Sequence, residues 1–461
     1  MKNIIASLPL PSVFFHAKSG NYYREDGEGA WLKLNESNIK KHLALCGYSV
    51  KEGSPLTEAD QCTVDIQDHQ NVAYIGPLAG FMTGLHKINN RNVLVSESPK
   101  LLKPAAGNWP ILKATFEAVL ADNAHDQLGV FYHWLKCGHQ AVSSGMWSPG
   151  QVMVLAGPVG AGKSLIQTII TKLLGGRSAH PYQYMTDRTP FNSSLMGAEH
   201  LVIEDENESV DIRSRRAFGA KIKAFAANRE QHCHGKNEDA CTLTPIWRVS
   251  VSLNDTPERI LVLPPLEEDI RDKITMLKAH CRQLPMPTST PAEKLAYMTA
   301  LENEMPAFLH YLNTLTIPES EYDPRFGVRA FHHPELLGLL ESSSPEAMLM
   351  MLVDMELFSM RNVPIADSRY AAETMRPWVG SAVELRAALT HHTSTVKREA
   401  EKLMIYANTC GTLLGRYSRI STGRDRISSQ LRNGQTIWTI RPPTHQQAMG
   451  CEITQQIITA E

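Results

Sequence analysis

The sequence from Gln151 to Gly176 reads QVMVLAGPVGAGKSLIQTIITKLLGG. It opens with a short, almost entirely apolar run, as expected of a buried parallel strand. Gly157 to Ser164 then satisfy the pattern G-x-x-x-x-G-K-[ST], and the apolar periodicity after them predicts a helix closed by Gly175-Gly176. The stretch therefore predicts a strand, a glycine-rich loop and a helix, in the order that suits the phosphates of a nucleoside triphosphate.

The residue types in this loop explain the expected ligand. Glycines let backbone N–H groups wrap a polyphosphate, and a helix N-terminus adds the positive end of its dipole. Lys163 can reach the β- and γ-phosphates, and the Ser164 hydroxyl can ligate Mg²⁺. We therefore expect ATP and Mg²⁺ as cofactors. The residues expected to contact the nucleotide are Gly157, Pro158, Gly160, Ala161, Gly162, Lys163, Ser164 and Leu165.

Length and composition limit the classes of protein to which the chain could belong. The 461 residues are 43% hydrophobic and 20% charged, as in ordinary globular chains, and a net charge of −2 argues against a wholly basic nucleic-acid coat protein. The eight cysteines form no C-x-x-C pair, which indicates neither a zinc site nor a disulfide framework. Without a secretory signal or a long apolar run, we expect a cytoplasmic protein with no membrane partner.

The pattern of elements predicts an α/β fold with several parts. These are a small mixed α/β domain at 1–105, a helical connector at 106–150, a P-loop ATPase core at 151–285, a helical region at 286–375, a winged-helix-like DNA-binding domain at 376–445 and a tail at 446–461.

A second landmark of the core is an apolar strand that ends in three carboxylates, Leu201 to Glu206. Next to the strand of the glycine-rich loop, it would carry Glu204, Asp205 and Glu206 to the edge of the sheet where ligands bind in open α/β sheets. One carboxylate, assigned to Asp205, would hold Mg²⁺ with Ser164, while a neighbour orients the attacking water. A solvated acidic turn is the alternative.

Further polar residues follow at intervals. Asn254 ends the alternating strand Trp247–Asn254 and could sense the γ-phosphate, although such an Asn is also common in turns. Lys236 lies in what could be a basic hairpin and could contact a nucleic-acid phosphate. Arg259 and Arg271 could each act as an arginine finger, and an ion pair with a neighbouring acid is the alternative.

The C-terminal part concentrates positive charge. Between Lys397 and Arg441 there are nine Lys or Arg against three Asp or Glu, a net +6 in a chain of net charge −2. Helices at 383–389 and 395–407, followed by two strands, resemble a winged helix, with the wing between Gly423 and Gly434. We therefore expect Arg424 and Arg426 to contact DNA. A solvated basic face on a structural or subunit-docking domain is the alternative.

The order of glycine-rich loop, acidic strand, basic hairpin and strand-tip Asn over about 130–285 resembles that of superfamily 3 helicases, including phage and mobile-element primase-helicases. The resemblance implies an AAA+-type ATPase that forms a ring, usually a hexamer, around single-stranded DNA. It assigns Lys163 and Ser164 to Walker A, Glu204 and Asp205 to Walker B, Lys236 to the pore hairpin, Asn254 to sensor 1 and Arg271 to the finger. Three consecutive acids leave the base open between Glu204 and Glu206.

These observations favour an ATP-dependent DNA helicase or translocase acting on single-stranded and forked DNA in replication of a phage or mobile element. No primase site is recognisable, so a separate primase or polymerase is an expected partner. The alternative is a nucleotide-switched DNA-binding assembly protein, such as an initiator, a loader or a subunit of an anti-phage complex. A small-molecule kinase is disfavoured, because it leaves Asn254 and the basic C-terminal part unexplained.

Overall fold

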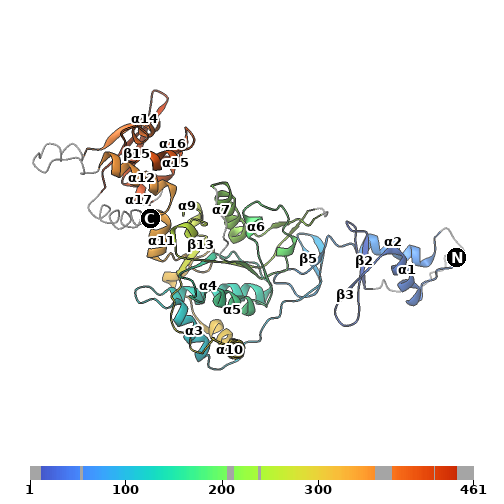
Figure 1. Cartoon of the computed structure of the whole chain (residues 1–461). Coiled ribbons are helices and arrows are strands. Elements are labelled where there is room, and N and C mark those ends of the chain that lie inside the picture. Colours follow the sequence, from blue (N-terminus) through green and yellow to red (C-terminus); the bar gives the residue numbers. More distant parts are fainter. Residues whose placement is uncertain are drawn as a thin grey trace, which may run out of the picture. The chain divides into compact units, whose positions relative to one another are not determined.

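A computed structural model describes residues 12–51, 56–204, 212–236, 240–358, 376–419 and 421–443, with only the backbone at 212, 213, 421 and 422. The described chain divides into two compact units (Figure 1). The first contains residues 1–255 and 272–333, and the second contains 256–271 and 334–461. The short segment Thr256–Arg271, within the range expected for the ATPase core, belongs to the second unit.

The first unit begins with a small antiparallel sheet and two helices. Its first two strands form a hairpin, and Gly20 adopts the left-handed φ of +65° that the turn requires. The elements are β1 (Val13–His16), β2 (Asn21–Glu25), β3 (Trp31–Leu34), α1 (Glu36–Leu45) and α2 (Glu58–His69).

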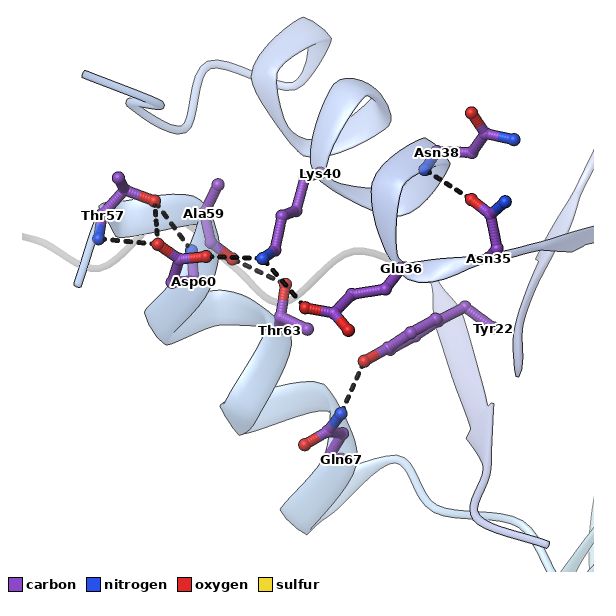
Figure 2. A network of polar contacts seen from close by, with 10 residues as sticks. All are labelled: Tyr22, Asn35, Glu36, Asn38, Lys40, Thr57, Ala59, Asp60, Thr63 and Gln67. Atoms are coloured by element: carbon purple, nitrogen blue, oxygen red, sulfur yellow. Dashed lines mark hydrogen bonds and ion pairs between the residues drawn. The ribbon is translucent and has the colours of Figure 1, made fainter. Parts of the chain in front are cut away.

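Lys40 joins the two helices of this part (Figure 2). Its ammonium lies 2.9 Å from a carboxylate oxygen of Glu36 on α1 and 2.9 Å from one of Asp60 on α2. Asp60 also accepts hydrogen bonds from Thr57, the residue that caps α2. The bond from Lys40, followed by those from Thr57, lowers the pKa of Asp60 to about 2.

A second small sheet and two helices lead to the central sheet. The sheet has the order β4-β6-β5, and the helices fall within the region expected to be helical. The bounds are β4 (Tyr74–Gly76), β5 (Gly84–Ile88), β6 (Arg91–Val95), α3 (Pro110–Leu120) and α4 (Gln127–Ser144).

The central sheet of the first unit is five-stranded and parallel, with the order β13-β7-β12-β9-β8. Apart from the short edge strand β8, its strands are almost fully buried because helices cover both faces. In Figure 1, α4 and α5 lie on one side of it and α6 and α7 on the other. Its strands and covering helices are β7 (Val152–Ala156), α5 (Lys163–Leu173), β8 (Ser178–Ala179), α6 (Tyr182–Met185), β9 (His200–Ile203), α7 (Ile212–Ala227), β12 (Arg248–Leu253) and β13 (Ile274–Lys278).

One expectation about this sheet is wrong. The acidic strand β9 does not lie beside β7, because β12 is inserted between them and pairs with both. The carboxyl ends still meet at one edge, since Leu253 is level with Ala156 and Val251 is level with Ile203. The remaining elements of the unit are a short 3₁₀ helix (Ser193–Leu195), the hairpin strands β10 (Gln231–Cys233) and β11 (Cys241–Leu243), the long helix α10 (Pro291–Thr314) and a second 3₁₀ helix (Glu319–Glu321).

The second unit packs helices against a three-stranded antiparallel sheet of order β14-β16-β15. Its core includes Leu349, Val353, Leu385, Leu414 and Trp438. The elements are α8 (Pro257–Ile260), α9 (Glu268–Arg271), α11 (Pro334–Ser342), α12 (Pro345–Leu357), β14 (Trp378–Ser381), α14 (Ala382–Leu389), α15 (Lys397–Leu403), α16 (Thr409–Tyr417), α17 (Ser421–Arg424), β15 (Ile427–Arg432) and β16 (Gln435–Ile440).

The turn between the last two strands is shorter than the sequence suggests. It consists of Asn433 and Gly434, both with positive φ (49° and 77°), which is the two-residue turn that favours Asn-Gly. Gly423 lies in α17 and not in the expected wing. In the described part of the chain, no single helix is long and apolar enough to cross a membrane; only α11 and α12 together reach that length and apolarity, and they bend by 67° at their break.

Candidate functional site

The glycine-rich loop connects β7 to α5, as the sequence predicts. Gly160 and Gly162 have φ values of +80° and +82°, which are strained for residues with a side chain. Gly157 is required for a different reason, because a Cβ there would lie 2.2 Å from the carbonyl oxygen of Ala279. Glycines at these positions therefore allow the loop to turn tightly against β13 and into the helix.

Lys163 and Asn254 meet at this loop although they are 91 positions apart. The ammonium of the buried Lys163 donates to the Asn254 amide oxygen at 3.0 Å, to the Gly157 carbonyl at 2.7 Å and to the Pro158 carbonyl at 2.9 Å. The insertion of β12 beside β7 makes this contact possible, since it brings the end of β12 next to the loop.

A cavity of about 560 Å³ opens at the same edge of the sheet, within the range of small-molecule sites. Glu204 at the end of β9 lines it, and so does Ser252 on β12, which the sequence analysis missed because a serine inside an apolar strand carries no motif. The full lining is Val159, Gly160, Ala161, Gly162, Lys163, Ser164, Leu165, Glu204, Ser252 and Asn254.

The chemistry of these residues fits a magnesium nucleotide. The N-cap residue of α5 is Gly162, which has no side chain to cap the helix, so the first N–H groups can face an anion. The Ser164 hydroxyl and the Glu204 carboxylate are exposed in the cavity, where they could hold Mg²⁺ directly or through water. Asp205 and Glu206 lie outside the described residues, so their assignment and the choice of base stay predictions.

A buried network of hydrogen bonds joins α5, β9 and β12, three elements whose ends line the cavity. His200 on β9 lies 2.7 Å from the Thr171 hydroxyl of α5 and 2.8 Å from the Ser250 hydroxyl of β12. Gln167 of α5 donates to Ser250 at 2.9 Å and to the carbonyl of Ile203 at 3.2 Å. The network joins α5 to the end of β9, and it thereby positions Glu204, the next residue.

This network predicts a pH dependence of stability. Complete burial lowers the pKa of His200 to about 3, whereas an unfolded His titrates near 6.5. The unfolded chain therefore takes up a proton first, and the free energy of unfolding should fall as the pH drops from about 6.5 towards 3, by about 2 kcal/mol at pH 5. Denaturant unfolding of His200→Gln between pH 5 and 7.5 should show a shallower slope than wild type. An equal slope would contradict this, and the exposed His310→Gln is the control.

Lys236 follows β10 and is exposed. It lines a second cavity, of about 480 Å³, together with Lys18 and Lys33 of the N-terminal sheet region. The Lys18 ammonium also donates to the carbonyl of Ala240 at 3.1 Å, beside the hairpin. The structure thus places three lysines around one cavity, a grouping that the sequence did not reveal.

The four predicted arginines all belong to the second unit: Arg259, Arg271, Arg424 and Arg426. Arg271 ends α9 and is exposed, as an arginine finger must be. Arg424 is 57% exposed and lies 2.5 Å from Glu268.

Arg426, the other predicted DNA contact, lies in the interior of the second unit. It is 5% exposed and forms a two-pronged ion pair with Asp354 of α12, at 3.0 and 2.7 Å. Burial raises the pKa of Asp354 although the arginine opposes this effect. A guanidinium committed to a buried carboxylate holds the unit together, so its position does not favour DNA contact.

No protein-family model matches the sequence, and no curated protein matches it. Among solved structures, the apo structure of the NrS-1 C-terminal region (305–718) covers 94% of this chain and 96% of that chain, with a TM-score of 0.54 and 14% identity. The A form apo structure of the same region gives the same values. The X-ray structure of JCV helicase covers 51% of this chain and 60% of that chain, with a TM-score of 0.26 and 15% identity, too low to argue from. The chain therefore shares the fold of the NrS-1 C-terminal region, over almost its whole length.

Proposed function

We propose that this chain is an ATP-dependent DNA helicase or translocase that works as an oligomeric ring, with a hexamer expected, in replication of a phage or mobile element. One observation carries the proposal. The uncapped N-terminus of α5, the Lys163 ammonium and the Asn254 amide converge on one cavity that Glu204 also lines. A loop that only binds nucleotide would need the α5 N-terminus and Lys163, but not Asn254 and Glu204.

The residues of the cavity have distinct roles in this proposal. When nucleotide binds, the Lys163 ammonium would donate to phosphate oxygens in place of the carbonyls of its own loop. Ser164 would hold Mg²⁺ with Asp205. Asn254, no longer bonded to Lys163, senses the γ-phosphate, and Glu204 or Glu206 orients a water molecule. ATP supplies the phosphoryl group whose transfer to water drives the motor. Arg271 of one subunit completes the site of its neighbour, where its charge stabilises the transition state.

The DNA contacts proposed here lie at two places. Lys236, with Lys18 and Lys33, offers a cluster of ammonium groups to the phosphates of a single strand. In the second unit, the order β14, α14, α15, α16, α17, β15, β16 supports a winged-helix-like DNA-binding region, whose wing would have the Asn433-Gly434 turn at its tip. Arg424, which is exposed, remains a proposed contact there.

ATP hydrolysis with and without single-stranded DNA tests the proposal, alongside strand separation on a forked duplex. We expect DNA to stimulate hydrolysis and strand separation to require ATP. Hydrolysis that is indifferent to DNA, without unwinding, would contradict a motor and would favour a nucleotide-switched assembly protein.

Lys236→Ala should separate the two activities. We expect it to abolish unwinding and DNA stimulation while basal hydrolysis stays within about twofold of wild type, because Lys236 does not line the nucleotide cavity. Lys294→Ala removes an exposed lysine from α10 and is the control. Unwinding by Lys236→Ala at the wild-type rate would remove this residue from the proposed DNA path.

A further inference from the structure

Four ionisable side chains from three separate stretches of the first unit form a His–Asp cluster: Asp122, His125, His280 and His333. Asp122 and His125 follow α3, His280 follows β13, and His333 ends the segment that lies beside β13. The sequence analysis did not find this cluster, because its members are spread over more than two hundred positions and carry no ligand spacing.

The donor atoms of the cluster lie close together. One carboxylate oxygen of Asp122, Oδ2, is 3.5 Å from Nε2 of His333 and 3.5 Å from Nε2 of His280. One donor atom each from Asp122, His125 and His333 all lie within 4.8 Å of one another. Ligand atoms about 2.1 Å from a tetrahedral ion are about 3.4 Å apart, so the distance of 3.5 Å between Asp122 and His333 matches one edge of a metal tetrahedron.

The backbone holds these donors in place. Oδ1 of Asp122 accepts the N–H groups of Ala124 at 2.9 Å and His125 at 3.0 Å, and the other oxygen therefore faces the imidazoles. The N–H of His280 donates to Val119 at 2.8 Å, and that of His333 donates to Met276 at 3.0 Å. Bonds that fix a ligating carboxylate and its neighbours are typical of metal sites.

An ordinary ion pair explains the cluster less well. A single imidazolium would neutralise Asp122, yet three imidazoles surround it, and two of them approach the same oxygen. At 3.5 Å these contacts are longer than good hydrogen bonds. Nε2 of His280 is buried and makes no hydrogen bond within the described residues. A cation held by Asp122, His125 and His333 would give the carboxylate and two imidazoles one shared partner.

We propose that Asp122, His125 and His333 bind one divalent transition-metal ion, Zn²⁺ in the first place. Two imidazoles and a carboxylate suit zinc in donor type and number. The ion would join the end of α3 to the end of β13. Both ends support the glycine-rich loop, since a Cβ at Gly162 would lie 3.0 Å from Val119 and one at Gly157 would meet Ala279.

The test uses the full chain without a polyhistidine tag, stripped of metal by a chelator and titrated with Co²⁺ or Zn²⁺ alone. We expect about one equivalent of Co²⁺ to bind, with the visible absorption of a tetrahedral or five-coordinate ion. Zn²⁺ at about 1,000 times its Kd should raise the Tm by about 5 °C or more. Neither readout depends on ATP hydrolysis, so the proposed motor function can fail without affecting the result.

Variants decide where the ion binds. Asp122→Asn keeps the acceptor for the two N–H groups and removes the carboxylate ligand, and His125→Gln removes an imidazole at a partly exposed site. Each should weaken Co²⁺ binding by at least about 100-fold, while His310→Gln, on the exposed face of α10, should leave it unchanged. Failure of the wild-type chain to bind either ion, or wild-type affinity in both cluster variants, would overturn the proposal.

Discussion

Replacing Lys163 by alanine is expected to lower ATP hydrolysis by at least about 100-fold, the usual effect of removing one charge-stabilising donor from a phosphoryl-transfer site. The Lys163 ammonium lies at the centre of the proposed site, bonded to two loop carbonyls and to Asn254. Its removal leaves the γ-phosphate without this cation and removes the Lys163–Asn254 hydrogen bond of the nucleotide-free state. Nucleotide binding, measured by fluorescence of a labelled ATP analogue, should weaken in parallel.

Lys172→Ala is the matched control for this experiment. Lys172 lies on the same helix, α5, and its ammonium is 2.7 Å from Glu302 in a half-exposed ion pair away from the cavity. Its loss should leave hydrolysis within about twofold of wild type and change stability by less than about 1 kcal/mol. Hydrolysis by Lys163→Ala at a rate close to that of Lys172→Ala would contradict the proposed nucleotide site.

The elements of the nucleotide site could be predicted from local pattern, but their arrangement could not. Continuous apolar runs located the buried parallel strands β7 and β9, and the alternating pattern of Trp247–Asn254 located β12, each within one or two residues. The pairing of parallel strands depends on contacts far apart in the chain, and each apolar run would fit beside any other. The place of β12 between β7 and β9, and hence the Lys163–Asn254 contact, needed the structure.

Charge counting was less successful in the C-terminal unit. Composition treats Arg424 and Arg426 alike, yet one is exposed and the other is paired with Asp354, 72 positions earlier. Composition also gives no sign of the His–Asp cluster or of the ion pair of Arg177 with Glu199. In both cases the residues come together only in the folded chain. Sequence reasoning therefore served best where a local motif dictates local geometry.

The ion pair of Arg177 with Glu199 is expected to have a large effect on stability. Glu199→Ala should lower the free energy of unfolding by about 3–5 kcal/mol, because it leaves a largely buried arginine without its counter-charge. Glu199 is fully buried, and it accepts from Nε of Arg177 at 3.0 Å, from Nη2 of the same residue and from the N–H of Gly80 at 2.8 Å. Arg177 also donates to the carbonyls of Leu78 and Glu97, so the pair fastens the β4–β6 region to the central sheet.

Urea unfolding of Glu199→Ala and Glu302→Ala measures the difference between a buried and an exposed ion pair on the same unit. Glu302→Ala breaks the half-exposed pair with Lys172 and should cost less than about 1 kcal/mol.

If most of the loss in Glu199→Ala comes from the unpaired arginine, Arg177→Met in the same chain should restore part of it, because replacing both charges removes the uncompensated one. A double variant that is less stable than Glu199→Ala would instead show that Arg177 stabilises the fold through the carbonyls of Leu78 and Glu97. A cost below about 1 kcal/mol for Glu199→Ala would contradict the role of the pair altogether, and the N–H of Gly80 would then have to find water in place of the carboxylate.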